Sequence, residues 1–304
     1  MEYILSTRAL CKSYRSCKAV DDLCMHIPKG AIYGFVGENG SGKTTLIRLI
    51  TGLQPPTGGE YTLYGIKNTD REIAKVRRRI GAVVETPAAY QGMTALENMR
   101  QQYTVLGLPD FSGIPELLRL VGLENTADKK VRNFSLGMKQ RLGIALALVG
   151  DPDFLILDEP TNGLDPQGII DIRELIVQLN RERQTTVLIS SHILSELSRL
   201  ATHYGFIHKG HMLQEISARQ LEEACRKCTR LQVTDSAVLA RILEGMSIDY
   251  TVLSRDTVDV YGVLNLSSLT LALIREGCEI LSLQEKNETL ESYYVNLVGG
   301  EHHA

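Results

Sequence analysis

The pattern of apolar and polar positions in the first 36 residues predicts β-strands followed by a glycine-rich turn. Apolar runs alternate with polar turns in "YILSTRAL", "AVDDLCMHI" and "GAIYGFVG". This pattern favours short strands, two joined by a polar turn and a third that is buried. The third, Ile32 to Val36, runs directly into a glycine-rich turn and then into "TTLIRLITGL", whose apolar spacing is helical. A buried strand, a glycine loop and a helix therefore follow one another.

The middle of the chain changes to helical periodicity and then alternates. Residues 91 to 150 lack strand-like runs and contain "ALENMRQQYTVLG", "IPELLRLVGL" and "MKQRLGIALALVG". Two continuous apolar strands come later, in "DFLILDEP" and "TTVLISSH". Alternating strands and helices of this kind indicate a mostly parallel sheet flanked by helices. We expect an α/β fold with an antiparallel β subdomain and an α-helical subdomain at about residues 91–150.

The pattern shifts again after about residue 220. The order there is strand, helix, strand, strand, helix, strand, from "TRLQVT" to "CEILSLQ", with a turn at Arg255 and Asp256. This βαββαβ order is typical of a small α+β domain of the ferredoxin-like kind. A last helix is expected in "TLESYYVNLVG". We therefore expect two domains, residues 1–220 and 221–304.

Composition narrows the classes of function. The 304 residues carry a formal net charge of −3, which argues against nucleic acid as the main partner because phosphate binding needs clustered cations. No stretch reaches the roughly 18 to 20 apolar residues that span a bilayer. If the protein works at a membrane, another chain provides the spans. The N-terminus lacks the apolar core of a signal peptide, so we expect a cytoplasmic protein.

The six cysteines do not form a recognisable metal or disulfide pattern. The pair Cys225 and Cys228 lies in "LEEACRKCTR", which we interpret as a polar helical stretch. No second CxxC or CxxH completes a zinc site. We expect unpaired thiols, which agrees with a reducing compartment.

The first motif that carries chemistry is "GENGSGKT", which matches G-x-x-x-x-G-K-[ST] in full. Its glycines let backbone N–H groups wrap a phosphate chain, and the following helix directs its N-terminus at the anion. The lysine reaches the β- and γ-phosphates, and the next hydroxyl ligates Mg²⁺. The expected nucleotide-binding residues are Gly37, Glu38, Asn39, Gly40, Ser41, Gly42, Lys43, Thr44 and Thr45, with Thr44 also a metal ligand.

The second motif is "FLILDEP", in which acidic residues follow a buried strand. Asp158 emerges at the carboxyl end of the strand, where ligands bind in open α/β sheets. We expect Asp158 to hold Mg²⁺, directly or through water. Glu159 comes next and is expected to accept the proton of an attacking water as general base.

A third motif, "NFSLGMKQRLGIALAL", resembles the signature of the ABC ATPase family. In that family a serine-glycine sequence at a helix N-terminus binds the γ-phosphate of ATP held by the opposite subunit. The family pattern L-S-G-G-Q stands here as Phe134 to Met138, with Ser135 and Gly137 at the positions that bind nucleotide. Leu136 and Met138 depart from the pattern, and their effect on activity stays open.

Further family elements follow in the expected order over residues 1 to about 215. Tyr14 matches the aromatic residue that stacks on adenine. Asp165, in "NGLDP", matches the loop at the dimer interface. His192, at the end of "LISSH", matches the residue that senses the γ-phosphate, and we expect it to act in catalysis with Glu159.

Glu85, in "GAVVETPAAY", stands where the family usually has a glutamine that ligates Mg²⁺. A carboxylate is at least as good a ligand for Mg²⁺ as an amide. We therefore expect Glu85 to be a metal ligand and a coupling residue, in a loop that also contacts the transmembrane partner. Glu85 and "FSLGMKQRL" together are similar to the ATPases of bacitracin-type and lantibiotic-immunity exporters, and the terminal helix is similar too.

The resemblance implies an ATP- and Mg²⁺-dependent ATPase that works as a homodimer and drives a separate permease, and the narrower similarity implies efflux of a peptide antibiotic. It also implies a place on the inner face of the cell membrane, held by the permease. Two alternatives stay open at this point. A soluble ABC ATPase would act on ribosomes or DNA, and a regulator would bind a ligand in its C-terminal domain. Nothing in residues 220 to 298 matches a ligand motif, so a dimer-stabilising or interaction role is the plainer interpretation there.

Overall fold

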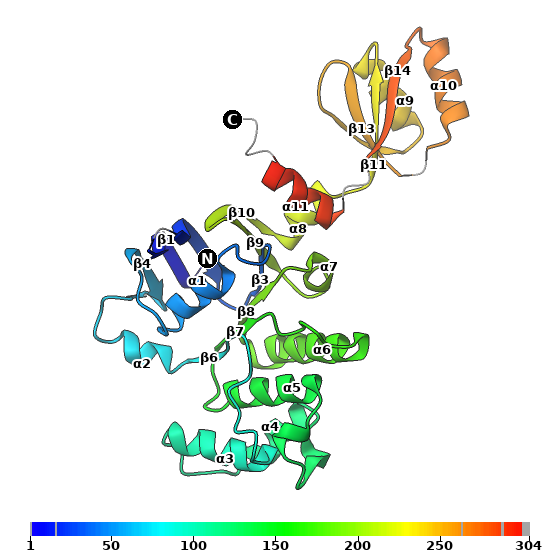
Figure 1. The fold of residues 1–304 in the computed structure, drawn as a ribbon. Helices are drawn as coiled ribbons and strands as arrows, with labels where there is room; N and C mark the ends of the chain where they lie inside the picture. Colours follow the sequence, from blue (N-terminus) through cyan, green and yellow to red (C-terminus); the bar gives the residue numbers. More distant parts are fainter. Residues whose placement is uncertain (1, 16, 263, 287–288, 300–304) are drawn as a thin grey trace. The chain divides into compact units, whose positions relative to one another are not determined.

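The computed structural model describes residues 2–15, 17–262, 264–286 and 289–299 (Figure 1). The chain divides into two compact units, residues 1–218 and 219–304. The division falls two residues before the domain boundary expected at residue 220. Each unit is described below by itself.

The centre of the first unit is a six-stranded sheet in the order β10-β9-β3-β8-β7-β6. Its strands are parallel except for β10, which is antiparallel to β9. Every residue of β3, β7 and β8 is buried, as their continuous apolar sequences require in a sheet that is covered on both faces. The mostly parallel α/β core expected from the sequence is thus confirmed. The strands are β3 (Ile32–Val36), β6 (Ile80–Val83), β7 (Phe154–Asp158), β8 (Thr186–Ser191), β9 (His203–His208) and β10 (His211–Ser217).

A second, antiparallel sheet in the order β2-β1-β4-β5 forms the β subdomain. Its two long strands have 12 residues each, so the expectation of short strands is wrong here. One hydrophobic cluster, which includes Leu10, Leu23, Phe35 and Leu46, joins this sheet to β3 and α1. The packing fixes the start of α1 against both sheets. The strands are β1 (Tyr3–Tyr14), β2 (Cys17–Pro28), β4 (Gly58–Leu63) and β5 (Ile66–Lys67).

Helices make up the segment between β6 and β7 and cover the main sheet. Within the described residues from 91 to 150, the elements are helices and one isolated bridge between Thr94 and Lys130. Helix α3 begins with a capping box, in which Thr94 and Glu97 bond each other's backbone N–H groups. The helices are α1 (Lys43–Ile50), α2 (Ile73–Arg77), α3 (Ala95–Val105), α4 (Ile114–Leu120), α5 (Leu136–Ala147), α6 (Pro166–Arg183) and α7 (Leu194–Leu197), with 3₁₀ turns η1 (Glu124–Thr126) and η2 (Val131–Asn133).

The second unit contains an antiparallel sheet in the order β12-β13-β11-β14. Its elements follow the order β11-α9-β12-β13-α10-β14, the strand and helix order expected from the sequence. Leu231, Val258, Leu239 and Leu269 belong to a hydrophobic cluster of its own. The elements are α8 (Ala218–Ala224), which begins at the boundary, β11 (Cys228–Val233), α9 (Ser236–Gly245), β12 (Asp249–Val252), β13 (Thr257–Tyr261), α10 (Leu266–Arg275), β14 (Ile280–Lys286) and α11 (Leu290–Gly299).

One expectation about the cysteines is wrong. Helix α8 ends at Ala224, and Cys228 is the first residue of β11, so Cys225 and Cys228 do not share a helix. The apolar spacing of β11 extends one residue further towards the N-terminus than the expected strand. All six cysteines are free thiols. Among the described helices, none is both long and apolar enough to cross a bilayer.

Candidate functional site

The carboxyl ends of three parallel strands meet at one edge of the main sheet. Val36, the last residue of β3, pairs with Ser191 of β8, and Asp158 of β7 pairs with Ser190. This register places the glycine-rich loop after Val36 beside the acidic residues that end β7. Ligands bind at this edge in open α/β sheets. The sequence motifs are therefore brought together by strand register and not by closeness along the chain.

The glycine-rich loop, residues 37–44, is shaped for a ligand that approaches its backbone. Gly40 and Gly42 have φ of +81° and +112°, in the left-handed region that favours glycine. A Cβ at Gly42 would collide with the carbonyl oxygen of Ala19. Gly42 also precedes the first residue of α1 and has no side chain to cap the helix. The N–H groups of the first turn are thus left for an anion.

Lys43 holds its ammonium group inside this loop. Its side chain is 5% exposed, and Nζ donates to the carbonyl oxygens of Gly37 (2.6 Å) and Glu38 (3.1 Å). The same Nζ lies 3.2 Å from Oε1 of Glu159. The cation is therefore positioned between the phosphate loop and the end of β7, where it can exchange a carboxylate for a phosphate.

Ser190 links the two acidic residues, and the sequence analysis missed it. Its hydroxyl donates to Oδ1 of Asp158 (2.6 Å) and accepts from the backbone N–H of Glu159 (2.9 Å). Both Ser190 and Asp158 are buried. The signal that could have identified Ser190 is a pair of serines at the end of the apolar run "TTVLISS", where a buried hydroxyl needs a partner. Ser190 thereby holds one of the two carboxylate oxygens of Asp158 in place.

Glu159 and His192 form a direct pair at the end of β8. Nδ1 of His192 lies 2.7 Å from Oε2 of Glu159. Where Glu159 accepts this hydrogen bond, Nδ1 of His192 is the donor, and Nε2 is the ring nitrogen not used in the pair. Glu159 has a φ of +49°, an uncommon conformation for a residue with a side chain, and such conformations cluster at functional sites. The pair fixes the orientation of both side chains.

The site fits a polyphosphate and a hard cation. Within the described part of the chain, Oγ of Ser41 is buried without a hydrogen-bond partner, and Oε1 of Glu159 is buried with the ammonium group of Lys43 3.2 Å away. A native protein rarely leaves a buried hydroxyl without a partner, so Ser41 indicates a ligand or water. Thr44 and Asp158 offer oxygen donors of the type that Mg²⁺ takes. Among the described residues, no three His, Cys, Asp or Glu side chains are grouped so that they could hold a metal ion.

Glu85 lies two residues beyond the end of β6 and is engaged with another element. Its carboxylate is paired with the guanidinium group of Arg48, in the last turn of α1. Its φ is +60°. The sequence analysis did not identify Arg48 as a partner, because the two residues are 37 positions apart.

Tyr14 ends strand β1 with a partly exposed ring. Its hydroxyl donates to Oε1 of Gln54, and Nζ of Lys12 lies 5.3 Å from the centre of the ring. The exposed ring face is compatible with the expected stacking on a base.

Ser135 and Gly137 lie at the start of α5, among the helices of the helical subdomain and apart from α1 (Figure 1). Ser135 caps α5, with its hydroxyl accepting from the N–H of Met138 at 3.2 Å. Leu136 is half exposed, and it packs close to Gly163 in the loop before α6. The signature is thus an exposed helix N-terminus, which a ligand can reach.

Asp165 has a structural role that the sequence analysis did not anticipate. Its Oδ1 accepts from the N–H of Gly168 at 3.0 Å, so Asp165 is the N-cap of α6. The cap stabilises the loop, residues 161–165, that lies against Leu136.

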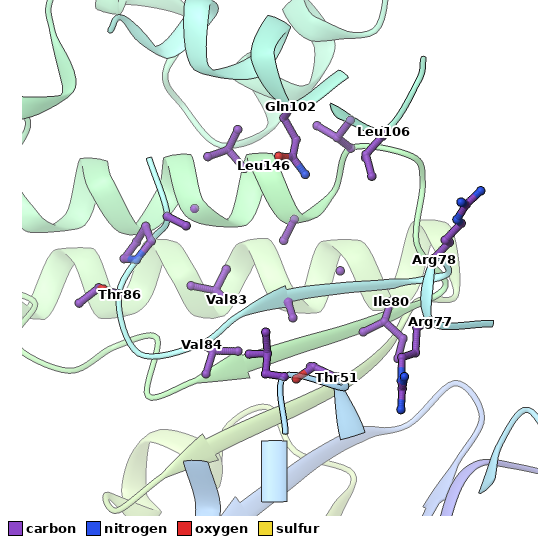
Figure 2. Close-up of a pocket in the computed structure, with 18 residues that line it drawn as sticks. Thr51, Arg77, Arg78, Ile80, Val83, Val84, Thr86, Gln102, Leu106 and Leu146 are labelled. Carbon is purple, nitrogen blue, oxygen red and sulfur yellow. The ribbon is translucent and has the colours of Figure 1, made fainter. Parts of the chain in front are cut away.

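A cavity of about 450 Å³ lies directly beyond Glu85. Figure 2 shows Val83 and Thr86 on one side of the cavity. The other side is formed by Gln102 of α3, Leu106 of the turn after α3 and Leu146 of α5. Its lining is mainly apolar, with Arg77 and Arg78 at one end. The cavity therefore lies between strand β6 and the helices α3 and α5, next to the loop that carries Glu85.

Comparison with known sequences agrees with the geometry of this site. A profile described as ABC transporter matches residues 20–162. The bacitracin transport ATP-binding protein BcrA of Bacillus licheniformis is 43% identical over 99% of this chain and 99% of its own. The lantibiotic transport ATP-binding protein SrtF of Streptococcus pyogenes is 43% identical, over 70% of this chain and 90% of its own.

Solved structures give the same picture for the first unit. The ATP-binding cassette MJ0796, a dimer in a post-hydrolysis state bound to ADP and phosphate, has a TM-score of 0.64 and 28% identity. The match covers 71% of this chain and 99% of that chain. The ADP conformation of the cassette MJ1267 has a TM-score of 0.66 and 25% identity over 74% of this chain and 95% of its own.

Proposed function

The chain belongs to the ABC transporter family as an ATP-binding protein with ATPase activity, and from this premise we propose that it powers a separate permease that exports a peptide antibiotic. The proposal depends on one observation, the share of the chain over which a bacitracin transport ATP-binding protein is similar. The 43% identity to a bacitracin transport ATP-binding protein covers 99% of both chains, so it includes the C-terminal unit. A soluble ABC ATPase acting on ribosomes or DNA is not favoured by relatives whose names refer to transport.

Nucleotide binding is assigned to the phosphate loop and its neighbours. The N–H groups at the start of α1 and the ammonium group of Lys43 would hold the phosphates, with the ring of Tyr14 against adenine. Thr44 and Asp158, together with Glu85, would hold Mg²⁺, which neutralises negative charge on the phosphates when bound. Lys43 now rests on two loop carbonyls and near Glu159, so it would turn towards phosphate when ATP binds.

Glu159 is the proposed general base. Once Lys43 has turned to the phosphates, Oε1 of Glu159 is free to accept a proton from the attacking water. His192 donates from Nδ1 to Oε2, which fixes the carboxylate and leaves Nε2 towards the γ-phosphate. The hydrogen bond that Ser190 donates to Oδ1 of Asp158, at 2.6 Å, orients this carboxyl group beside it.

Two copies of the chain are proposed to share each nucleotide. Ser135 and Gly137 lie at the exposed start of α5 and not in the phosphate loop at the start of α1, so they suit the nucleotide of a second copy. The test mixes Ser135→Arg with Lys43→Ala, each inactive alone. A heterodimer contains one site with both halves intact, and some ATP hydrolysis should return. Heterodimers that form without recovering any activity would count against shared sites.

The permease is proposed to dock in the cavity beyond Glu85. The cavity is apolar, large enough for side chains of a short helix, and walled by the loop that carries Glu85. Leu106→Glu should abolish co-purification of the permease while ATP binding persists. Val105→Glu is the matched control, because Val105 is adjacent, 68% exposed and not part of the lining. Equal loss in both variants, or in neither, would refute this docking site.

The cargo is tested in proteoliposomes that contain the chain with its cognate permease. Bacitracin or a lantibiotic should stimulate ATP hydrolysis, whereas an unrelated linear peptide should not. If neither antibiotic stimulates a complex that hydrolyses ATP, the transport role stands and the peptide-antibiotic cargo is wrong.

A further inference from the structure

The pairing of Glu85 with Arg48 carries a consequence for metal binding. The Glu85 carboxylate is 54% exposed and the Arg48 side chain 34% exposed, yet the two are in direct contact. The carboxylate therefore points towards α1 from the loop after β6, and its position is determined by a cation of this chain. A neutral glutamine at residue 85 would be held less firmly, because hydrogen bonds between two ionised groups are the stronger ones.

Arg48 and Thr44 lie on one face of α1. They are four residues apart in an α-helix that runs from Lys43 to Ile50, so their side chains are neighbours along the same stripe. Thr44 is the residue proposed above to ligate Mg²⁺. Glu85 is thus paired with a position one helical turn away from the proposed metal ligand. A change of the Glu85 rotamer with a small shift of the loop would move the Glu85 carboxylate from Arg48 to the proposed metal position beside Thr44.

We propose that Arg48 is a positioning residue that competes with the metal ion for the Glu85 carboxylate. Without Mg²⁺·ATP the carboxylate pairs with Arg48, and with Mg²⁺·ATP it leaves Arg48 and faces the metal. The exchange is feasible because an ion pair this exposed is weak and reforms readily. This inference rests on the proposed function, since it takes Mg²⁺ at Thr44 and Asp158 as given.

The competition predicts the sign of one measurable effect. Removal of Arg48 frees the carboxylate and takes a positive charge away from the metal, so a divalent cation should bind more tightly. Exposed ion pairs have strengths that correspond to a change of about two- to fivefold in affinity. In a chain that already lacks the Glu85 carboxylate, removal of Arg48 changes only a screened charge, so the affinity for the cation should rise by no more than about 1.5-fold.

The experiment measures how strongly a fluorescent derivative of the non-hydrolysable analogue AMP-PNP binds to the protein as the Mn²⁺ concentration is raised, and takes the Mn²⁺ concentration at half-maximal binding as the measure of Mn²⁺ affinity. The variants are Arg48→Ala, Arg48→Lys, Glu85→Ala and the double variant Arg48→Ala/Glu85→Ala. Circular dichroism checks that each is folded. Arg48→Lys keeps a cation that can reach the carboxylate, because the observed contact uses a single guanidinium nitrogen. It should therefore retain the parental affinity.

Tighter Mn²⁺ binding in Arg48→Ala, lost in the Glu85→Ala background and reversed in Arg48→Lys, supports the competition. An unchanged affinity in Arg48→Ala overturns it. An equal gain with and without Glu85 also overturns it, because Arg48 would then act by charge alone. If the parental protein binds no Mn²⁺ with AMP-PNP, the proposed function fails first, and this outcome is distinguishable because it needs no variant.

Discussion

In the unit formed by residues 1–218, Oγ of Ser41 is buried without a hydrogen-bond partner, and Oε1 of Glu159 is buried 3.2 Å from Nζ of Lys43. In the unit formed by residues 219–304, the buried Asp259 accepts two hydrogen bonds from Arg230, at 2.6 and 2.7 Å. In the described part of the chain, the buried side-chain nitrogen and oxygen atoms without a hydrogen-bond partner all belong to the first unit, and two of them lie outside the phosphate loop and the end of β7. At the proposed nucleotide site, Ser41 and Glu159 can thus accept a ligand, whereas Asp259 is bound within its own unit.

The two units differ in the partners of their buried polar groups. A buried polar atom without a partner costs stability, about 1–3 kcal/mol when it results from the loss of one partner. The first unit tolerates this cost at the proposed nucleotide site. In the second unit, the buried Asp259 has its hydrogen bonds satisfied by Arg230, which stabilises that unit. Substitutions in the two units should therefore change different quantities.

The largest effect is expected from Glu159→Gln. The amide keeps the shape of the side chain but cannot accept a proton, so ATP hydrolysis should fall by about 10²- to 10⁴-fold. ATP binding should persist, because Lys43 and the phosphate loop are unchanged. Phosphate release and binding of a fluorescent ATP analogue are the two measurements. Hydrolysis at the parental rate would remove Glu159 from the role of base.

In the second unit, Asp259→Asn should change stability and not catalysis. Asp259 is 7% exposed, and the substitution removes its charge and replaces one accepting oxygen with an NH₂ donor that faces Arg230, which should destabilise this unit by about 1–3 kcal/mol. Hydrogen exchange in peptides from β11 and β13 measures the change. The matched control is Asp249→Asn, whose exposed pair with Arg226 should contribute less than about 0.5 kcal/mol. Equal effects of the two substitutions would contradict the assignment of a structural core to the Arg230 pair.

The second unit should also lose stability in acid. Hydrogen bonds from Ser254, Gln232 and Thr257 lower the pKa of Asp256 from 3.8 to about 2, and the Arg230 guanidinium lowers the pKa of Asp259. A depressed carboxyl pKa in the folded state stabilises it above the unfolded value, and this stabilisation is lost as the pH falls through the folded value.

Protection of β13 against exchange, corrected for intrinsic rates, should therefore decline between about pH 4 and pH 2. Asp256→Asn should flatten this decline. A decline of the same steepness in the variant would show that other groups cause it.

The smallest effect is expected from Ser41→Ala, which should stabilise the folded protein, whereas Asp259→Asn should destabilise it. Removing a buried hydroxyl without a partner should stabilise the nucleotide-free protein by about 0.5–1 kcal/mol while weakening nucleotide binding. Ser190→Ala is the matched control. Its hydroxyl bonds Asp158 and Glu159, so its removal should destabilise the first unit by about 1–3 kcal/mol. Exchange in peptides from β3 and β7 reports both. Destabilisation by Ser41→Ala would show that its hydroxyl has a partner in solution.

The sequence by itself determined the elements and the residues that follow local rules. The sequence predicted the strand before Gly37, the helix after Gly42 and the strand that ends at Asp158. Each of these depends on side-chain periodicity over fewer than 20 residues or on the backbone freedom of glycine. The order of strands and helices in the second unit could be predicted for the same reason.

Only the tertiary structure decided which side chains meet. Ser190 contacts Asp158 because β8 lies beside β7 in one particular register, and no property of "LISSH" alone shows that register. Glu85 meets Arg48 because α1 and the loop after β6 are packed together, although they are distant along the chain. Asp165 caps a helix because the chain turns at that residue. Periodicity determines which face a residue occupies, but the partner on that face depends on how separate elements pack, and this is a property of the whole fold.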